Sequence, residues 1–272
     1  MDRYCVFGNP IAHSKSPEIH AAFAAQTGHK LEYEKRLVPL NRFDAAVHAF
    51  IGEGGKGANV TVPFKLEAVE LVQALTMRAR MAGAVNTLQF TPLGIVGDNT
   101  DGVGLVTDIV NNAGVSIKGK RVLLLGAGGA ARGVMLPLLE QLPARLLITN
   151  RTVSTAELLA QHFAPLGGKG VVSACGFEEV EGAFDIVINA TSASLGAELP
   201  AVPSSVFAAG ALALDMMYGK EPTPFLRFAA SHGATPRDGL GMLVEQAAEA
   251  FALWREVRPD TREVLEQLRA QQ

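Results

Sequence analysis

The segment RVLLLGAGGAARG, residues 121–133, restricts the fold of this chain more than any other stretch of its sequence. An apolar run indicates a buried strand, the glycines a tight turn, and the residues after them a helix. The turn fits the pattern G-x-G-x-x-A through Gly126, Gly128 and Ala131. Such glycines let the backbone approach a pyrophosphate at a helix N-terminus. A glycine turn can also serve packing alone, but the strand-turn-helix context favours a dinucleotide site.

The sequence on both sides of this turn alternates between strand-like and helical segments. Strand-like runs at 144–150, 184–191 and 211–217 are separated by helical sequence, which is typical of a doubly wound, Rossmann-type sheet. The first hundred residues indicate a second, mostly parallel sheet with the order β-α-β-α-β-α. Thr91-Pro92-Leu93-Gly94 predicts a turn that joins two of its strands as a hairpin. We therefore expect an α/β protein with two lobes.

The heptapeptide NVTVPFK, residues 59–65, alternates polar and apolar residues as a strand does. Pro63 has no N–H and should end the pairing, so Lys65 is expected just beyond the strand, where a helix from about 64 to 75 begins. Ligands of α/β proteins bind at strand ends. The position of this lysine therefore suggests a functional role.

Two further patterns predict helix starts. Ser16 followed by Pro17 indicates an N-cap and a proline at the first helical position. Ser154 and Glu157 have the spacing of a capping box.

The composition limits the class of partner. The 272 residues carry a formal net charge of -3, with 48% hydrophobic and 19% charged residues, which gives no reason to expect nucleic acid or an anionic membrane as partner. Two cysteines, Cys5 and Cys175, suit neither a disulfide framework nor a metal site, and indicate a reducing compartment. Without a signal-peptide core or a long apolar run, the expected location is cytoplasmic.

The strand after the glycine turn indicates which dinucleotide binds. An NAD site usually places an acid at the end of this strand, whereas here Asn150-Arg151-Thr152 follows. Arg151 can pair with a 2′-phosphate and stack on adenine, although it could also be an ordinary solvated arginine. The sequence therefore favours NADP over NAD.

Further segments occur in a fixed order along the chain: GNPIAHSKSP (8–17), ANVTVPFK (58–65), GAVNTL (83–88), GDNTDGVG (97–104), LLGAGGAARG (124–133), NRT (150–152), INATS (188–192), LDMMY (214–218) and DGLGMLVEQAA (238–248). Through these segments the chain resembles the shikimate dehydrogenase family along essentially its full length. That resemblance implies reversible NADPH-dependent reduction of 3-dehydroshikimate to shikimate, on the chorismate route to aromatic amino acids. It also implies a substrate domain of residues 1–101 and 237–272 and a Rossmann NADP domain of residues 102–236.

The resemblance also assigns residues. Lys65 matches the family's catalytic lysine and Asp101 its partner. The positions that match its substrate contacts are Ser14, Ser16, Asn59, Thr61, Asn86, Tyr218 and Gln246. The positions that match its cofactor contacts are Gly126, Ala127, Gly128, Gly129, Ala130, Asn150, Arg151, Thr152, Thr191, Met216 and Gly239.

Two positions depart from the family pattern. Thr155 stands where a second basic residue usually follows the NRT motif, so Arg151 alone would bind the 2′-phosphate. Met77 stands where many members have an acid.

The assigned pair suits the chemistry. Reduction of a ketone requires a proton for the oxygen, and a lysine can supply it while the cofactor carries the hydride. A nearby helix start would favour the neutral amine and Asp101 the charged form, and the sequence leaves open which dominates. We assign the two residues as a coupled pair with Lys65 as the proton carrier.

The same residues also fit simpler interpretations. Taken without the family, Lys65 is an ordinary exposed lysine, Asp101 a helix cap and Gln246 a surface residue. The alternative functions are a quinate and shikimate dehydrogenase that uses NAD, and a non-catalytic NADP-sensing homologue. The expected partner is a small-molecule substrate, and the expected assembly is a monomer or a homodimer.

Overall fold

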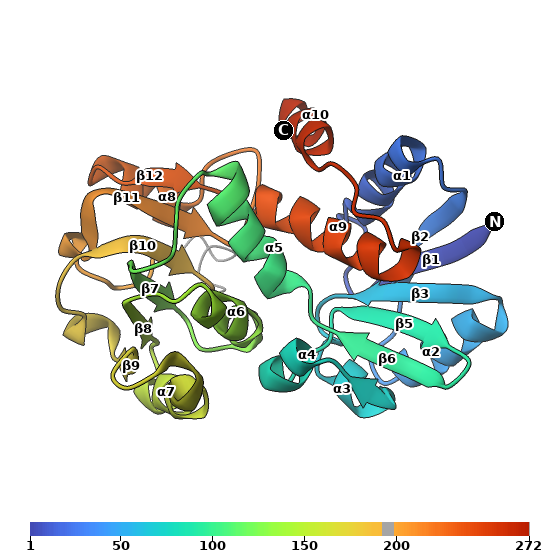
Figure 1. Cartoon of the computed structure of the whole chain (residues 1–272), viewed down its shortest axis with the longest axis horizontal. Helices are drawn as coiled ribbons and strands as arrows, with labels where there is room; N and C mark the ends of the chain where they lie inside the picture. The colour runs from blue at the N-terminus through green and yellow to red at the C-terminus, as the bar shows by residue number, and fades with distance from the viewer. Residues whose placement is uncertain (192–198, 272) are drawn as a thin grey trace. The chain divides into compact units, whose positions relative to one another are not determined.

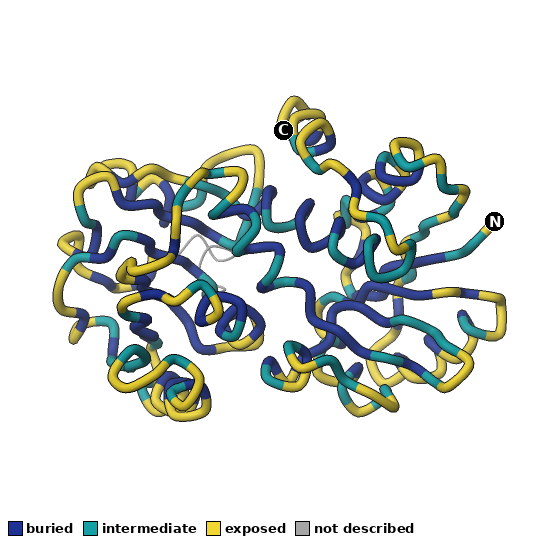
Figure 2. The backbone as a smooth tube through the Cα atoms, in the orientation of Figure 1, coloured by how far each residue is buried: buried dark blue, intermediate teal, exposed yellow. Residues whose placement is uncertain are grey.

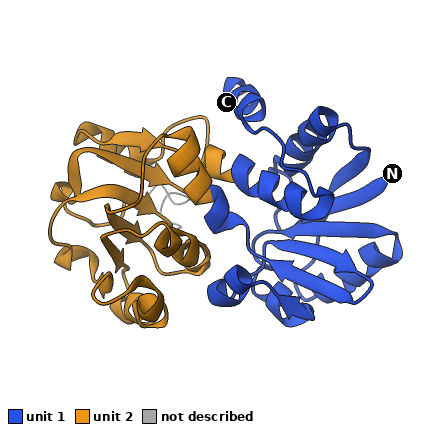
Figure 3. Cartoon of the chain, viewed as in Figure 1, with its two compact units in different colours: residues 1–104, 244–271 blue, residues 105–243, 272 orange. Residues whose placement is uncertain are grey.

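The computed structural model describes residues 1–191 and 199–271. The chain forms two compact units (Figure 3): unit 1 comprises residues 1–104 and 244–271, and unit 2 comprises residues 105–243. The last residue of the INATS motif, Ser192, lies outside the described residues. None of the helices within the described residues combines the length and the hydropathy that a membrane-crossing segment requires.

Unit 1 is built on a six-stranded sheet with the order β2-β1-β3-β5-β6-β4 (Figure 1). Strand β1 is parallel to β2 and β3, and β4 is parallel to β6, whereas β5 is antiparallel to β3 and β6. The β5–β6 pair confirms the predicted hairpin. The elements are β1 (Asp2–Gly8), α1 (Ser16–Thr27), β2 (Leu31–Leu37), α2 (Phe43–Gly52), β3 (Gly55–Val60), α3 (Glu67–Leu71), β4 (Ala74–Leu75), α4 (Met77–Ala82), β5 (Thr87–Thr91), β6 (Gly94–Asp98) and α10 (Arg262–Ala270).

Aromatic side chains fill the core of unit 1. Phe7 of β1 packs edge-on against Phe43 and Phe50 of α2, and Phe43 stacks on Phe64 with ring centroids 5.1 Å apart. All four rings are buried. Figure 2 shows buried residues along the central strands β1 and β3 and exposed residues at the turns. The burial of Phe64 fixes the backbone beside Lys65.

Unit 2 has a six-stranded sheet with the order β12-β11-β10-β7-β8-β9, and every neighbouring pair is parallel. This is the doubly wound order of a Rossmann-type domain and confirms the predicted fold class. The elements are β7 (Arg121–Leu125), α6 (Gly129–Glu140), β8 (Arg145–Thr149), α7 (Val153–Gly167), β9 (Val172–Cys175), β10 (Phe184–Asn189), β11 (Phe207–Asp215), α8 (Pro224–Ser231) and β12 (Thr235–Arg237), with 3₁₀ turns at Phe177–Glu179 and Ser204–Val206. The helices α5 (Asp101–Thr107, continued by a π-helical turn at Asp108–Asn112) and α9 (Leu240–Arg255) contribute residues to both units.

Both predicted helix caps are wrong. Helix α1 begins with Ser16 itself, and its N-cap is Lys15, which makes no side-chain cap hydrogen bond. Helix α7 begins at Val153 after Thr152, so Ser154 lies inside the first turn and forms no capping box. In both cases the helix begins one or two residues earlier than the polar side chain suggested.

The helix expected over 64–75 is also wrong. Strand β3 ends at Val60, and the turn that follows is closed by a hydrogen bond from Phe64 N to Thr61 O of 3.0 Å. The helix that follows, α3, spans only Glu67–Leu71, and β4 begins at Ala74. Gln73 cannot continue the helix, because its N–H donates to Ile95 O on β6 at 3.0 Å.

Candidate active site

Lys65 lies in the turn between β3 and α3, where its neighbours hold its backbone in place. Phe64 is buried in the core, and Val85 N donates to Lys65 O at 2.9 Å. The side chain is 29% exposed, and its Nζ donates to Asp101 Oδ2 at 2.6 Å. On sequence alone Lys65 could be an ordinary solvated lysine, whereas in the structure it forms an ion pair.

Strand pairing explains why Asp101 reaches Lys65 from a distant part of the chain. Thr87, at the start of β5, lies opposite Asn59 of β3 and opposite Asp98 of β6. The end of β3, the start of β5 and the end of β6 therefore meet at one edge of the sheet. Asp101, which begins α5 three residues after β6, lies at this edge.

Asn86 connects the ion pair to a wider network. Its Nδ2 lies 2.8 Å from Asp101 Oδ1, 3.0 Å from Thr100 Oγ1 and 3.2 Å from Gln246 Oε1. Its Oδ1 accepts from Thr100 N at 2.8 Å. Gln246 is buried in unit 1, so the surface position considered for it on sequence alone is wrong.

Asn59 joins the same network from β3. Its Nδ2 donates to Asn86 O at 3.2 Å and to Thr87 Oγ1 at 3.1 Å, and Thr87 Oγ1 donates to Asn86 Oδ1 at 2.9 Å. Thr61, two residues on, donates its N–H to Phe7 O at 2.9 Å. Five of the expected residues thus share one hydrogen-bonded cluster, namely Lys65, Asp101, Asn86, Gln246 and Asn59.

The two expected serines form a pair of their own. Ser14 Oγ lies 3.1 Å from Ser16 Oγ and accepts from Ser16 N at 3.3 Å. Ser14 is partly exposed and Ser16 is buried. Hydroxyl groups and free amides at a helix start can bind a carboxylate.

A buried ion pair supports the loop that carries Asp101, and sequence reasoning missed it. Arg78 of α4 donates to both carboxylate oxygens of Asp98, at 2.7 and 2.6 Å, and to Glu249 of α9 at 2.9 Å. Burial would raise the pKa of Asp98, but the hydrogen bonds and charge of Arg78 outweigh it and lower that pKa. Met77, the departure from the family pattern, is exposed beside this pair at the start of α4.

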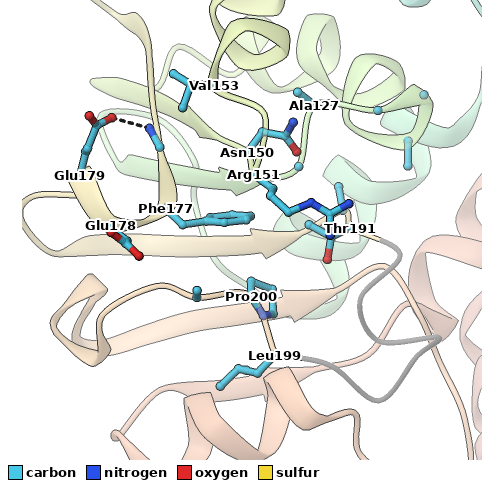
Figure 4. Close-up of a pocket in the computed structure, with 17 residues that line it drawn as sticks. Ala127, Asn150, Arg151, Val153, Phe177, Glu178, Glu179, Thr191, Leu199 and Pro200 are labelled. Carbon is cyan, nitrogen blue, oxygen red and sulfur yellow. Dashed lines mark hydrogen bonds between the residues drawn. The ribbon is translucent and has the colours of Figure 1, made fainter.

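Unit 2 contains a cavity of about 960 Å³ at the carboxyl edge of its sheet (Figure 4). Its floor favours glycine at position 126, where φ is 105°, a conformation that L side chains rarely adopt. Gly128 has an extended backbone and is the N-cap residue of α6. Eight expected cofactor residues line it: Gly126, Ala127, Gly128, Gly129, Ala130, Asn150, Arg151 and Thr191. The turn, the exposed start of a twelve-residue helix and the absence of an acid at positions 150–152 fit a dinucleotide with a 2′-phosphate.

Several residues that line this cavity were missed by the sequence analysis. Glu179 Oε2 accepts from Gly176 N at 2.7 Å, and Figure 4 shows this contact at one side of the cavity. The sequence did contain a signal for them, because residues 176–179 follow strand β9 and so lie at the same sheet edge as the glycine turn. The missed residues are Val153, Gly176, Phe177, Glu178, Glu179, Ala190, Leu199, Pro200 and Ala201.

Four other expected residues lie elsewhere in unit 2. Thr152 is the N-cap residue of α7. Gly239 packs so closely on Met216 that a Cβ there would overlap the Met216 carbonyl, and its N–H donates to Met217 O at 3.0 Å. Tyr218 follows β11 and is partly buried, which raises its pKa. None of these four is among the described residues that line the cavity.

Comparisons with known proteins converge on one family. Three family models match: the shikimate dehydrogenase substrate binding domain over residues 6–88, shikimate / quinate 5-dehydrogenase over 108–197, and the shikimate 5'-dehydrogenase C-terminal domain over 239–269. A shikimate dehydrogenase (NADP(+)) of Janthinobacterium sp. (strain Marseille) is 62% identical over 268 residues, covering 98% of this chain and 97% of that protein.

Solved structures agree with this result. An Ael1 enzyme from Pseudomonas putida is 50% identical with a TM-score of 0.94, and the match covers 98% of both chains. The shikimate 5-dehydrogenase of Thermus thermophilus, solved with NADP(H) and shikimate, is 32% identical with a TM-score of 0.88, covering 99% of both chains.

Proposed function

The chain belongs to the shikimate dehydrogenase family, and on this premise we propose that Lys65 and Asp101 handle the proton of its reaction. The protein is an NADP-dependent oxidoreductase of the shikimate pathway. Its reaction is the reversible reduction of 3-dehydroshikimate to shikimate, on the route to chorismate and the aromatic amino acids.

The observation that carries the proposal is the 2.6 Å ion pair between Lys65 Nζ and Asp101 Oδ2. The pair lies at a sheet edge, where bound ligands are common in α/β proteins. The Lys65 side chain remains 29% exposed, so a substrate can reach the ammonium group.

When bound, NADPH supplies the hydride that adds to the carbonyl carbon of the substrate. In that direction, the Lys65 ammonium gives a proton to the carbonyl oxygen and becomes a neutral amine. In the reverse direction, the amine takes the hydroxyl proton of shikimate. The Asp101 carboxylate stabilises the ammonium form and keeps Nζ in position, while Asn86 holds the other Asp101 oxygen.

The neutral side chains around this pair suit a substrate that carries hydroxyl groups and a carboxylate. Amide and hydroxyl groups can each donate and accept hydrogen bonds. We propose that Asn59, Asn86 and Gln246 bind the hydroxyl groups together with Thr61. The carboxylate would be bound by the Ser14–Ser16 pair and by Tyr218.

We propose that the phosphates of NADP bind at the turn Gly126–Ala130 and that Arg151 binds the 2′-phosphate. Arg151 is the cation among the described residues that line the cavity, and no acid occupies positions 150–152. Asn150 and Thr152 flank the arginine. Thr191, Met216 and Gly239 are proposed to contact the nicotinamide half.

A direct assay tests this function against the two alternatives. Absorbance at the NADPH band would follow oxidation of shikimate and of quinate, each with NADP⁺ and with NAD⁺. We expect the highest kcat/KM with shikimate and NADP⁺. Faster turnover of quinate with NAD⁺ would favour the broader dehydrogenase, and cofactor binding without any turnover would favour an NADP sensor.

Substitution of the lysine tests the assigned chemistry. We expect Lys65→Ala to lower kcat by about 10²-fold or more with little change in the KM for shikimate, because the proton carrier is lost while the substrate contacts remain. Lys56→Ala is the matched control, since Lys56 is an exposed lysine of the neighbouring strand β3. Near-normal turnover in Lys65→Ala, with a normal melting temperature, contradicts the assignment.

We also propose a cytoplasmic location and a small assembly. Cys5 and Cys175 are both free thiols, as is usual in a reducing compartment. Light scattering on the purified protein would distinguish a monomer from a homodimer.

A further inference from the structure

A buried aromatic pair lies behind Asn59 and is not part of the expected substrate set. His20 of α1 and Tyr33 of β2 stack with ring centroids 4.3 Å apart and an angle of 6° between the rings. His20 is fully buried, and Phe23, Phe251 and Trp254 surround it. The stack therefore holds the Tyr33 ring in one position against the core.

The Tyr33 hydroxyl group is directed at a candidate substrate residue. Its O–H donates to Asn59 Oδ1 at 2.7 Å. Burial raises the pKa of Tyr33 well above its ordinary value, and the nearby Ser16 hydroxyl opposes part of that rise. Tyr33 is thus the neutral donor that lies between Ser16 and Asn59, two residues expected to contact substrate.

The contacts of Asn59 determine the orientation of its amide group. The carbonyl oxygen faces the Tyr33 hydroxyl, and Nδ2 donates to Asn86 O and to Thr87 Oγ1. A flipped amide would turn its carbonyl oxygen toward the Asn86 carbonyl, so that two acceptors face each other, and the Tyr33 hydroxyl would have to change from donor to acceptor. Since both Nδ2 hydrogens are used inside the protein, a second lone pair on Oδ1 is what Asn59 can offer to a ligand.

We propose that Tyr33 is a positioning residue that fixes the Asn59 amide so that Asn59 accepts a hydrogen bond from a hydroxyl group of the substrate. The inference rests on the proposed function, because it takes Asn59 as a substrate contact. It adds that Asn59 Oδ1 binds a substrate group that donates a hydrogen bond, a hydroxyl, and not a group that only accepts one, a carbonyl. The carbonyl that is reduced is then bound by other groups, in agreement with the role of Lys65.

His20 contributes packing to this arrangement. Neither ring nitrogen has a hydrogen-bond partner among the described residues. Burial lowers the pKa of His20 to about 3, although the nearby Asn59 side chain opposes part of the shift. The imidazole is therefore neutral at pH 7, and the stack carries no charge that would compete for the Tyr33 hydroxyl.

The test is Tyr33→Phe, which removes the hydroxyl group and keeps the stacked ring. We expect the KM for shikimate to rise about tenfold while kcat changes by less than about threefold, because one hydrogen bond of Asn59 is lost and the Lys65–Asp101 pair remains. The KM for NADP⁺ should not change. A rise confined to the KM for shikimate would not follow from a merely structural role, which would affect both substrates or the yield of folded enzyme.

Tyr4→Phe is the matched control. Tyr4 lies directly opposite Tyr33 in the β1–β2 pair, and its hydroxyl accepts from Arg255 instead of contacting Asn59. Both variants remove one hydroxyl group from a tyrosine in neighbouring strands. We expect wild-type kinetics for Tyr4→Phe.

A double-mutant cycle shows whether Tyr33 acts through Asn59. In the Asn59→Ala background, Tyr33→Phe should cause no further rise in the KM for shikimate. An unchanged KM in the single variant overturns the proposal, as does an equal rise in both backgrounds.

A second readout separates this proposal from the function itself. The side-chain amide signals of Asn59 in a ¹⁵N NMR spectrum should shift in Tyr33→Phe and remain in place in Tyr4→Phe. If the wild-type enzyme does not oxidise shikimate, the proposed function fails and these signals alone decide the role of Tyr33. Unchanged signals in Tyr33→Phe overturn it.

Discussion

Arg151 is the residue that we propose to distinguish NADPH from NADH. Thr155 replaces the second basic residue of the family pattern, and Glu178 and Glu179 place two carboxylates in the same cavity. We expect Arg151→Ala to raise the KM for NADPH about tenfold or more and to change that for NADH far less, because a charged hydrogen bond to phosphate is lost. Steady-state kinetics with each cofactor measure this.

Arg145→Ala provides the control for that variant. Arg145 begins β8, the strand that Arg151 follows, and its guanidinium lies over the Phe184 ring. Arg145 is not among the described residues that line the cavity. The change in net charge is the same. If Arg151→Ala raises the KM for both cofactors equally, the guanidinium does not recognise the 2′-phosphate.

At the scale of residues, sequence motifs indicated the two members of the Lys65–Asp101 ion pair but not the side chains that surround the candidate site. Lys65 and Asp101 were assigned from motifs, and the structure brings them within 2.6 Å. Tyr33 and Phe177 were missed, since a tyrosine in a strand and a phenylalanine after one are typical core residues. The directions in which the Tyr33 and Phe177 side chains point depend on tertiary contacts, which no short sequence pattern encodes.

At the scale of elements, strands and their order were predictable and helix ends were not. The hairpin β5–β6 follows from local turn residues, whereas the early end of β3 depends on pairing with β1 and β5. Helix α3 is short because the chain returns to the sheet at β4. Competition with sheet pairing is a tertiary effect that propensity does not capture.

Arg78 illustrates how one side chain stabilises several elements. It joins α4 to β6 through Asp98 and to α9 through Glu249. We expect Arg78→Met to lower the free energy of unfolding by about 3 kcal/mol, because the 1% exposed Asp98 carboxylate would lose its cationic partner. Urea denaturation measures the loss.

The comparison for this prediction is Arg121→Met in unit 2. Arg121 also makes two side-chain contacts with one aspartate, Asp185, but its side chain is 46% exposed. We expect a much smaller loss of stability, since exposed pairs are screened by water. Equal losses in the two variants would show that burial of Asp98 does not determine the effect.

At the scale of the whole molecule, the alternating pattern predicted two α/β sheets, and the structure contains them. The alternating pattern does not explain why residues 244–271 belong to unit 1. Helix α9 delivers Phe251 and Trp254 to the aromatic core around His20, so the last part of the chain completes a core that the first hundred residues begin. Hydrophobic periodicity indicates that a helix has an apolar face, but it does not identify the surface that this face covers.

This shared core makes the stability of the molecule depend on pH through His20. Its pKa is about 3 in the folded protein and about 6.5 in an unfolded chain, so between these values the unfolded chain binds one more proton. Stability is therefore lost as the pH falls through this window, by up to roughly 1.4 kcal/mol per pH unit. We expect His20→Phe, which keeps a stacked ring, to reduce the acid slope by that amount.

The fluorescence of Trp254 reports unfolding around His20, because Trp254 is the chain's single tryptophan and its ring lies 5.4 Å from that of His20. Urea unfolding followed by its fluorescence at pH 7, 6 and 5 gives the slope for each protein. The pKa values of Asp98 and Asp185 are also lowered, but the folding stability that depends on these two carboxylates is lost only at lower pH. Both aspartates are present in every variant. Tyr4→Phe removes no group that titrates in this range and should keep the wild-type slope. Parallel curves for wild type and His20→Phe would mean that His20 is not the group that couples folding to acid.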